Sequence, residues 1–205
     1  MKTCSDSLSI TKGLIRPSCN FRTVVPPEGI RFQHRTGLPF LGLTANSSSE
    51  ITNCDVDKIT VKSVNGYAGG IAGSISGSSV DTPYRKIEQC YNAGNVSATE
   101  KYSAGIFGDS SSKVKIDYCY NIGNITSSGD YAAGIAINAY KINNCYSSGK
   151  ISAASYDSGI VSKNLSWDTY TNNYYLLGSA TSSLGSETSV TDSELKSKSM
   201  VTTLN

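Results

Sequence analysis

Four cysteines recur at one place in a repeated pattern, and they are the residues of this chain that most directly suggest chemistry. They are Cys54, Cys90, Cys119 and Cys145. A structural zinc site usually draws its thiolates from closely spaced pairs such as Cys-x-x-Cys, whereas these cysteines are 36, 29 and 26 residues apart. The spacing favours a ladder of small buried side chains, one on each turn of a repeat, over a metal or redox centre. Disulfides between adjacent turns, or between Cys4 and Cys19, are open alternatives.

Two carboxylates occupy matching places in the pattern, two residues before a cysteine. These are Glu88 and Asp117, which the repeat predicts to be neighbours on adjacent turns. Paired carboxylates can cleave sugars or bind Ca²⁺, but Thr52 and Asn143 fill this place in the flanking turns. The single histidine, His34, lies outside the repeats, so no Ser/His/Asp or Cys/His arrangement can be assembled. We expect no catalytic residue, no metal and no cofactor, and predict that the protein is not an enzyme.

Tyrosine recurs in two further places, which form two rows. The first tyrosine row is Tyr91, Tyr120 and Tyr146, with Tyr175 as its last member. The second tyrosine row is Tyr67, Tyr102, Tyr131 and Tyr156. An exposed row would suit sugar rings or a partner protein, and we predict a ligand or partner strip here; the alternative is that the rings shield corners and strand faces. Because neither row is interleaved with Lys or Arg in the sequence, a stacking platform for single-stranded nucleic acid is not expected.

The net charge also argues against nucleic acid. The formal charge is +2, but residues 1–35 hold six Lys/Arg against two acidic residues, which leaves the remainder at −2. Phosphate-backbone binding requires clustered basic residues. No run approaches the roughly 18 apolar residues of a membrane span, and the N-terminus lacks the pattern of a signal peptide. We therefore expect no membrane insertion and no export signal within this chain.

The positions around the cysteines repeat too, and this repetition predicts the fold. Isoleucine stands three residues before each cysteine, at Ile51, Ile87, Ile116 and Ile142. A second set follows a glycine, at Ile71, Ile106, Ile135 and Ile160. Each period holds three short apolar clusters separated by Gly, Asn and Ser, which are long enough for strands and too short for helices. The variable length is concentrated in one connection, as is typical of a solenoid.

We therefore predict an all-β fold, a right-handed parallel β-helix (β-solenoid) with about three short strands per turn and a short C-terminal capping helix. Turns stacked at about 4.8 Å place Ile on Ile and Cys on Cys as a structural core ladder. Residues 1–36 are predicted to be an irregular leader or N-terminal cap, and 37–178 the repeat domain, with Tyr174 in the cysteine place of its last turn. Residues 179–205 are a linker and a helix near 192–200 that begins with a capping box, Thr191-Asp192-Ser193-Glu194.

Two motifs alternate along the chain. Ile-x-x-Cys-Tyr-Asn-x-Gly-Asn-Val/Ile occurs at 87–96 and 116–125, and Tyr-x-Ala-Gly-Ile at 102–106 and 131–135. This alternation resembles the GLUG-motif repeats of large bacterial surface and secreted proteins, over about residues 37–205. The resemblance implies an extracellular or cell-surface stalk or adhesin-like module within a larger multidomain chain. It transfers no catalytic residue, because the motif is defined by repeat packing.

These observations favour a non-catalytic repeat module that acts as a structural stalk or as a binding surface for host or environmental glycan or surface protein. The alternative is a polysaccharide-acting β-helix enzyme, or the carbohydrate-binding part of one, because that fold hosts many such enzymes. A cleft lined by stacked acidic and basic side chains would favour the alternative.

Overall fold

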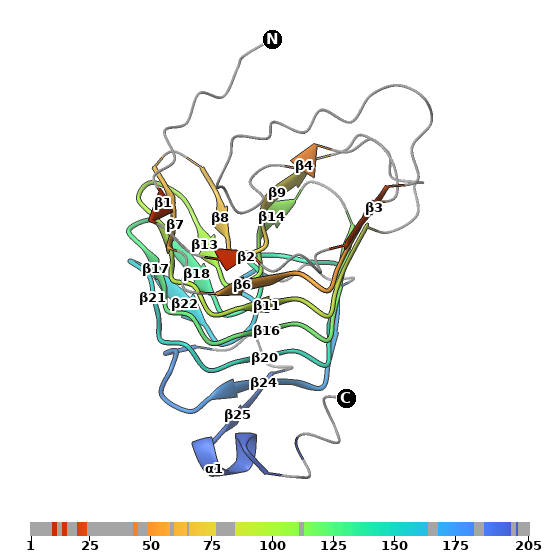
Figure 1. Ribbon diagram of the computed structural model, residues 1–205. Coiled ribbons are helices and arrows are strands. Elements are labelled where there is room, and N and C mark those ends of the chain that lie inside the picture. The colour runs from red at the N-terminus through yellow and green to blue at the C-terminus, as the bar shows by residue number, and fades with distance from the viewer. Residues whose placement is uncertain are drawn as a thin grey trace.

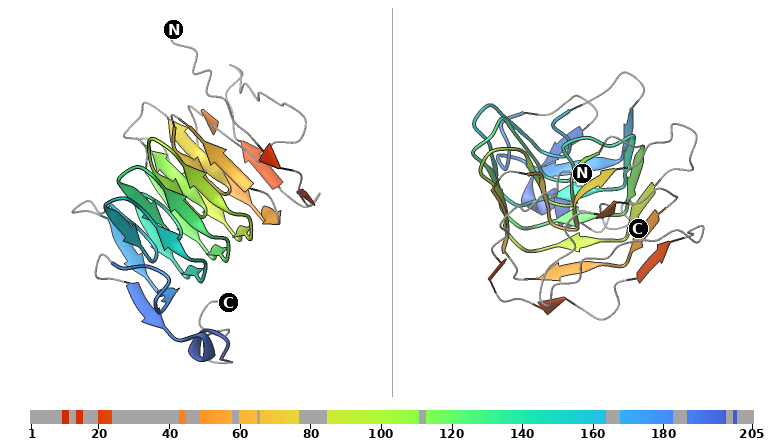
Figure 2. Two further views of the ribbon diagram at one scale, coloured as in Figure 1. Left: turned by 90° about the vertical axis from the view of Figure 1, so that its left-hand side faces the viewer. Right: turned by 90° about the horizontal axis from the view of Figure 1, so that it is seen from above.

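The computed structural model describes most of the chain from residue 49 onward and short pieces before it. The described residues are 10–11, 14–15, 20–23, 43–44, 49–57, 60–64, 66–76, 85–110, 113–163, 168–182, 187–197 and 200. Short strands account for nearly all of the regular structure, and they stack as successive parallel layers (Figures 1 and 2). This stacking of parallel strands confirms an all-β, parallel solenoid. Within the described residues, no helix has the length and apolar character needed to cross a membrane.

The strands of the solenoid fall in five sheets, whereas three strands per turn were expected from the sequence. The first two full turns have a strand in every sheet, and the third and fourth have strands in four sheets and only isolated bridges at Ala136 and Val161 toward the fifth. The first full turn contains β5 (Ser49–Thr52), β6 (Asp55–Asp57), β7 (Thr60–Ser63), β8 (Ala68–Gly69) and β9 (Ala72–Ser76). The second contains β10 (Arg85–Glu88), β11 (Tyr91–Asn92), β12 (Val96–Ala98), β13 (Ser103–Ala104) and β14 (Phe107–Ser110).

The later turns repeat this order. The third contains β15 (Val114–Asp117), β16 (Tyr120–Asn121), β17 (Ile125–Ser127) and β18 (Tyr131–Ala133). The fourth contains β19 (Lys141–Asn143), β20 (Tyr146–Ser147), β21 (Ile151–Ser152) and β22 (Tyr156–Ser158). The last elements are β23 (Thr169–Thr171), β24 (Asn173–Leu176), β25 (Glu187–Val190) and α1 (Asp192–Leu195). Figure 1 shows β6, β11, β16, β20 and β24 one below another.

Identical residues stack in register through the centre of the solenoid. Ile51, Ile87, Ile116 and Ile142 pair on consecutive strands. The glycine-linked isoleucines, Ile71, Ile106, Ile135 and Ile160, are joined by backbone hydrogen bonds between turns. All eight are at most 2% exposed and belong to one core cluster. Burial of these side chains provides the apolar driving force that a single turn could not obtain alone.

The four repeat cysteines line the same core, but they are not chemically equivalent. Cys90, Cys119 and Cys145 are free, buried thiols, whereas Cys54 is in a disulfide. Hydrogen bonding to Cys119 and burial raise the pKa of Cys90, and burial raises the pKa of Cys119. These two thiols therefore remain protonated and unreactive at neutral pH. The alternative pairing of Cys4 with Cys19 concerns residues outside the described ones.

A buried amide ladder accompanies the cysteines. Asn92 Nδ2 donates to Asn121 Oδ1 (2.7 Å), and Asn121 Nδ2 donates to the Gly123 carbonyl oxygen (2.9 Å) and to Ser147 Oγ (3.3 Å). The Gly123 N–H donates back to Asn121 Oδ1 (3.2 Å). Both asparagines have 0% exposure. Each amide thus satisfies the backbone of its own corner and the side chain of the next turn.

Replacing Asn121 with alanine is expected to lower the free energy of unfolding by about 2 kcal/mol, because it leaves buried donors and an acceptor unpaired. Urea denaturation of both proteins measures this change. Asn124 provides a matched control: its Oδ1 accepts from the Lys150 N–H (3.0 Å) at an exposed corner. Asn124→Ala should lower the free energy of unfolding by less than about 1 kcal/mol, because water replaces the lost hydrogen-bond partner. Equal losses for the two variants would contradict the role assigned to the buried ladder.

The N-terminal end of the solenoid is bordered by strands that run the opposite way. β1 (Ile10–Thr11), β2 (Leu14–Ile15) and β3 (Asn20–Thr23) pair antiparallel with β7, β6 and β5. A fourth short strand, β4 (Leu43–Thr44), pairs parallel with β9. Three of the five sheets therefore end in an antiparallel strand, which occupies an edge that would otherwise offer unpaired backbone groups.

At the C-terminal end, the register differs by one residue from the sequence alignment. Tyr174 pairs with Tyr146, so Asn173, not Tyr174, takes the cysteine place. Its Oδ1 accepts from the Cys145 N–H (3.1 Å). Tyr175 is not the last member of the first tyrosine row; it pairs with Ser147 and packs against the core, where Tyr170 replaces isoleucine. Aromatic rings do close the stack, but at other places than the expected one.

The short helix α1 begins as predicted and ends earlier. Thr191 Oγ1 accepts from the Glu194 N–H and the Glu194 carboxylate accepts from the Thr191 N–H, so the capping box is confirmed. The helix covers Asp192–Leu195 rather than extending without interruption to 200, and none of its residues is buried. The strand before α1, β25, pairs with β24.

Candidate binding groove

One corner of every turn has a left-handed backbone. Asn53, Gln89, Tyr118, Asn144 and Asn172 have φ values between 52° and 56°. These five residues, here called the left-handed corner, turn the chain from the sheet of β5 into the sheet of β6, and each directly precedes the cysteine place. Asparagine adopts this conformation readily, whereas glutamine and tyrosine do so rarely.

A groove of about 720 Å³ lies over this corner. The corner residues Asn53, Gln89, Tyr118 and Asn144 line one part of it, and Tyr120, Ile122, Tyr146 and Ser148 line another. Asp192, Leu195 and Lys196 at the C-terminal helix complete the lining. Since residues from four consecutive turns contribute, the groove extends along the stacking direction of the solenoid.

Two members of the first tyrosine row, Tyr120 and Tyr146, line the groove, and Tyr91 contacts Tyr120 beside it. The ring centroids of Tyr91 and Tyr120 are 4.4 Å apart, and those of Tyr120 and Tyr146 are 5.0 Å apart with nearly parallel planes (5°). Parallel rings at this distance turn their faces toward one another. Tyr120 and Tyr146 therefore offer ring edges and phenolic hydroxyls to the groove, rather than the open ring faces of a stacking platform.

The hydroxyls of Tyr146 and Tyr91 are neutral hydrogen-bonding groups at neutral pH. Burial, followed by the neighbouring Tyr120 and Tyr91, raises the pKa of Tyr146 to about 12. Burial also raises the pKa of Tyr91. A protonated phenol both donates and accepts hydrogen bonds. The row can therefore bind polar ligands without introducing charge.

Two apolar side chains beside the row are unusually exposed. Tyr118 is 44% exposed and Ile122 is 45% exposed. Large exposed apolar groups next to hydrogen-bonding groups are typical of binding surfaces. Among the described residues of the lining, the charged side chains are Asp192 and Lys196, and they form an ion pair with each other (2.7 Å). The groove is consequently neutral, with amide, hydroxyl and aromatic groups.

Lysines lie over three rings of the second tyrosine row, an arrangement that the sequence did not lead us to expect. Lys163 Nζ lies 4.0 Å from the ring centroid of Tyr102 and 4.8 Å from that of Tyr131. Lys101 Nζ lies 4.9 Å from the ring centroid of Tyr67. Lys163 lies far in the sequence from Tyr102 and Tyr131, so sequence proximity could not reveal it, whereas Lys101 directly precedes Tyr102. Cation–π contacts of this kind stabilise the sheet face and occupy ring faces of Tyr67, Tyr102 and Tyr131 that a ligand would need, whereas Tyr156 is 57% exposed.

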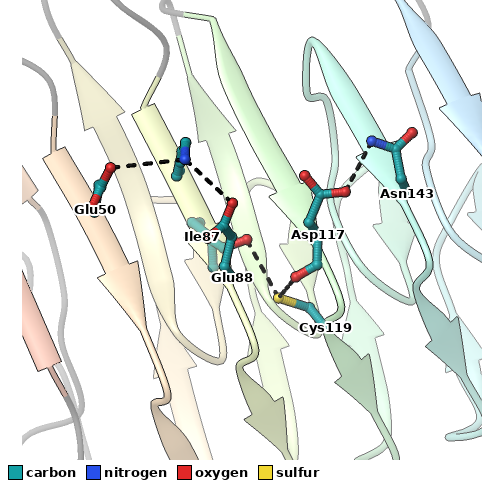
Figure 3. A network of polar contacts seen from close by, with 7 residues as sticks. Glu50, Ile87, Glu88, Asp117, Cys119 and Asn143 are labelled. Atoms are coloured by element: carbon teal, nitrogen blue, oxygen red, sulfur yellow. Dashed lines mark hydrogen bonds and ion pairs between the residues drawn. The ribbon is translucent and has the colours of Figure 1, made fainter. Parts of the chain in front are cut away.

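The predicted carboxylate pair lies on the outer face of the β10–β15 sheet. Glu88 and Asp117 pair directly, as the repeat predicted. Each carboxylate is engaged by a different neighbour. Lys86 Nζ contacts Glu88 (3.6 Å) and Glu50 (3.9 Å). Asn143 Nδ2 donates to Asp117 Oδ1 (2.9 Å), as Figure 3 shows. Asp117 and Glu88 are therefore parts of a surface polar network rather than an isolated acid/base pair.

A lysine row on this face was missed from the sequence. Lys86, Lys115 and Lys141 stack in register two residues before the carboxylate place. Their spacing to the cysteines is the signal that could have found them, since they stand four residues before Cys90, Cys119 and Cys145. Among the described residues, no group of three or more His, Cys, Asp or Glu could hold a metal ion.

The groove itself joins residues that are far apart in the sequence. The first tyrosine row was predicted as a possible ligand strip, but the left-handed corner, Ile122 and the contribution of α1 were not. Comparison of this chain with protein-family models, with curated proteins and with solved structures finds no match. The functional argument therefore depends on the geometry of the groove and on the sequence pattern.

Proposed function

We propose that this protein is a non-catalytic repeat module whose groove is a binding surface for a glycan or a protein on another surface. The observation that carries the proposal is the neutral groove of about 720 Å³, in which Tyr118 and Ile122 remain exposed. The polar groups described in its lining donate and accept hydrogen bonds but include no unpaired charged group suited to acid/base work. The solenoid serves as the rigid support that holds these groups at a constant spacing.

We further propose that the module works outside the cell or at the cell surface of a bacterium, as part of a larger multidomain chain. The resemblance to GLUG-motif repeats supports this location. The disulfide at Cys54 supports it too, because structural disulfides persist in oxidising compartments. Right-handed winding of the solenoid is proposed on general grounds, since parallel crossover connections are almost always right-handed.

The rival function is a polysaccharide-acting enzyme. The adjacency of Glu88 and Asp117 on an exposed sheet face favours this candidate. Its weakness is the network in Figure 3, where Lys86 and Asn143 already bind the two carboxylates. An enzyme would place its carboxylates beside a cleft for the sugar, whereas neither residue lines the groove.

A combined binding and turnover screen tests the proposed function. The protein is incubated with immobilised panels of polysaccharides and bacterial and animal surface proteins, and both retention and release of soluble fragments are measured. We expect retention of at least one ligand with no fragment release. Release that is abolished by Glu88→Gln would establish the rival function instead. Tyr102→Ala should leave retention unchanged, because Lys163 covers that ring.

A further inference from the structure

We infer that the groove takes a neutral, linear glycan that lies parallel to the solenoid axis, with Tyr118 and Gln89 as its main contacts. This inference rests on the proposed function and names the class of its ligand. It is argued from the charge of the lining, from the backbone conformation of two lining residues, and from the repetition of the lining along the axis.

The charge of the lining selects the ligand class. Apart from the paired Asp192 and Lys196, the side chains are amides, hydroxyls, a thiol, aromatic rings and aliphatic groups. An acidic polymer would bring carboxylates or sulfates that no free cation among the described lining residues could neutralise, and an unpaired charge is costly to desolvate. Neutral sugars instead offer hydroxyl groups that amides and phenols can pair, together with apolar C–H faces for exposed rings.

The backbone conformation identifies the residues that matter. In three of the five turns the left-handed corner is asparagine, the residue type that tolerates positive φ, but Gln89 and Tyr118 adopt φ values of 54° and 52°. Positive φ is unfavourable for such side chains, and outliers of this kind concentrate at ligand-binding sites. The Tyr118 side chain gains little packing that would compensate for this strain, since it is 44% exposed. Its presence is explained if it contacts a ligand.

The repetition of the lining sets the direction of the ligand. Asn53, Gln89, Tyr118 and Asn144 stand at the same corner of four consecutive turns, separated by about 4.8 Å per turn. A polymer that runs along the axis would meet one corner residue at each step, and a polymer across it would meet only one in total. Several weak, regularly spaced contacts reinforce one another for a linear chain that presents repeating hydroxyl groups.

Tyr118→Asn is the decisive variant, because it installs the residue found at the same corner in other turns. We expect its thermal midpoint to be equal to or higher than that of the wild type, while the affinity for neutral glycan falls about tenfold or more. Ile122→Ser is a second groove variant that should also weaken binding. Tyr156→Asn is the matched control: Tyr156 is 57% exposed but lies in the second tyrosine row, and its loss should not change binding.

Affinity electrophoresis and calorimetry with defined polymers provide the measurement. The probes are neutral linear glucans, mannans and xylans, with polygalacturonate and dextran sulfate as acidic counterparts. Binding of a neutral polymer that is weakened by Tyr118→Asn and Ile122→Ser supports the inference. Groove-dependent binding to acidic polymers or proteins alone would overturn the ligand class and leave the proposed function standing. Absence of binding to any neutral polymer overturns the inference, and ligand retention that is unaffected by both groove variants would overturn the proposed function too.

Discussion

Replacing Gly105 with alanine is expected to lower the free energy of unfolding by about 4 kcal/mol or more, the largest effect of any single substitution considered for this protein. An added Cβ would lie well inside the van der Waals distance of the Gly134 carbonyl oxygen on the next turn and 2.5 Å from Asn121 Cγ. The first group is backbone within a hydrogen-bonded layer, and the second is fixed in the buried amide ladder. Neither can move without separating two turns.

Gly178→Ala provides the control for this substitution. Gly178 has a φ of 82°, but nothing lies within 4 Å of its potential Cβ. Only the conformational penalty remains there, which is about 1 kcal/mol. Equilibrium denaturation in urea, monitored by circular dichroism, compares the two variants. A loss for Gly105→Ala as small as that for Gly178→Ala would show that the turns are less tightly stacked than the structure indicates.

Glu187→Gln is expected to stabilise the protein by about 3 kcal/mol at pH 8 and to leave its stability unchanged near pH 4. Glu187 lies on β25 and its carboxylate accepts from the Val161 N–H (2.9 Å) and from Ser158 Oγ (3.4 Å) at the last turn. Burial raises the pKa of Glu187 from 4.5 to about 7, although hydrogen bonds from Val161, Ile160 and Ser158 oppose the rise. The glutamine side chain of the variant would keep an acceptor oxygen and never ionise.

The direction of this effect follows from proton binding. Between pH 4.5 and about 7, the folded protein retains a proton on Glu187 that the unfolded chain has released. The free energy of unfolding of the wild type therefore falls as pH rises through this interval and stays low above it. The difference between 4.5 and about 7, at about 1.4 kcal/mol per pH unit, gives about 3 kcal/mol.

Denaturation of both proteins at several pH values between about 4 and 9 measures the effect, and the difference between them removes contributions from other groups. Glu194→Gln is a control of opposite sign. Backbone and side-chain hydrogen bonds from Thr191 lower the pKa of Glu194, so that substitution should destabilise the protein at neutral pH and lose its effect in acid. Parallel pH profiles for wild type and Glu187→Gln would contradict the assigned burial.

The repeated core could be predicted from the sequence because its residues recur at fixed short spacings along the chain. Each isoleucine stands a fixed distance from its cysteine, so aligning Cys90 with Cys119 also aligned Ile87 with Ile116, and the structure pairs them. Stacking of identical layers converts this one-dimensional pattern directly into contacts. The adjacency of Glu88 and Asp117 was predictable for the same reason.

Features that depend on departures from the repeat could not be predicted from the sequence. In the last turn, either Tyr174 or Tyr175 could be aligned with Tyr146, because the two tyrosines are adjacent. The structure pairs Tyr174 with Tyr146, which places Asn173 beside Cys145 in a buried hydrogen bond that the sequence pattern does not show. The groove depends on where α1 lies and on the left-handed backbone of Tyr118, which its residue type argues against. The covering of Tyr102 by Lys163 joins segments from different turns.

The antiparallel strands β1, β2 and β3 have a consequence for how this architecture can change in length. Because they match the edge of the first turn only, they fix one terminus of the stack, and the aromatic closure by Tyr170 and Tyr175 fixes the other. A turn duplicated between these ends would meet the same Ile, Cys, Asn and Gly on both sides and would need no new interface. The number of turns, and with it the length of the groove, could thus change by duplication of a turn. The residue at the left-handed corner of each added turn would then determine which side chain that turn contributes to the groove.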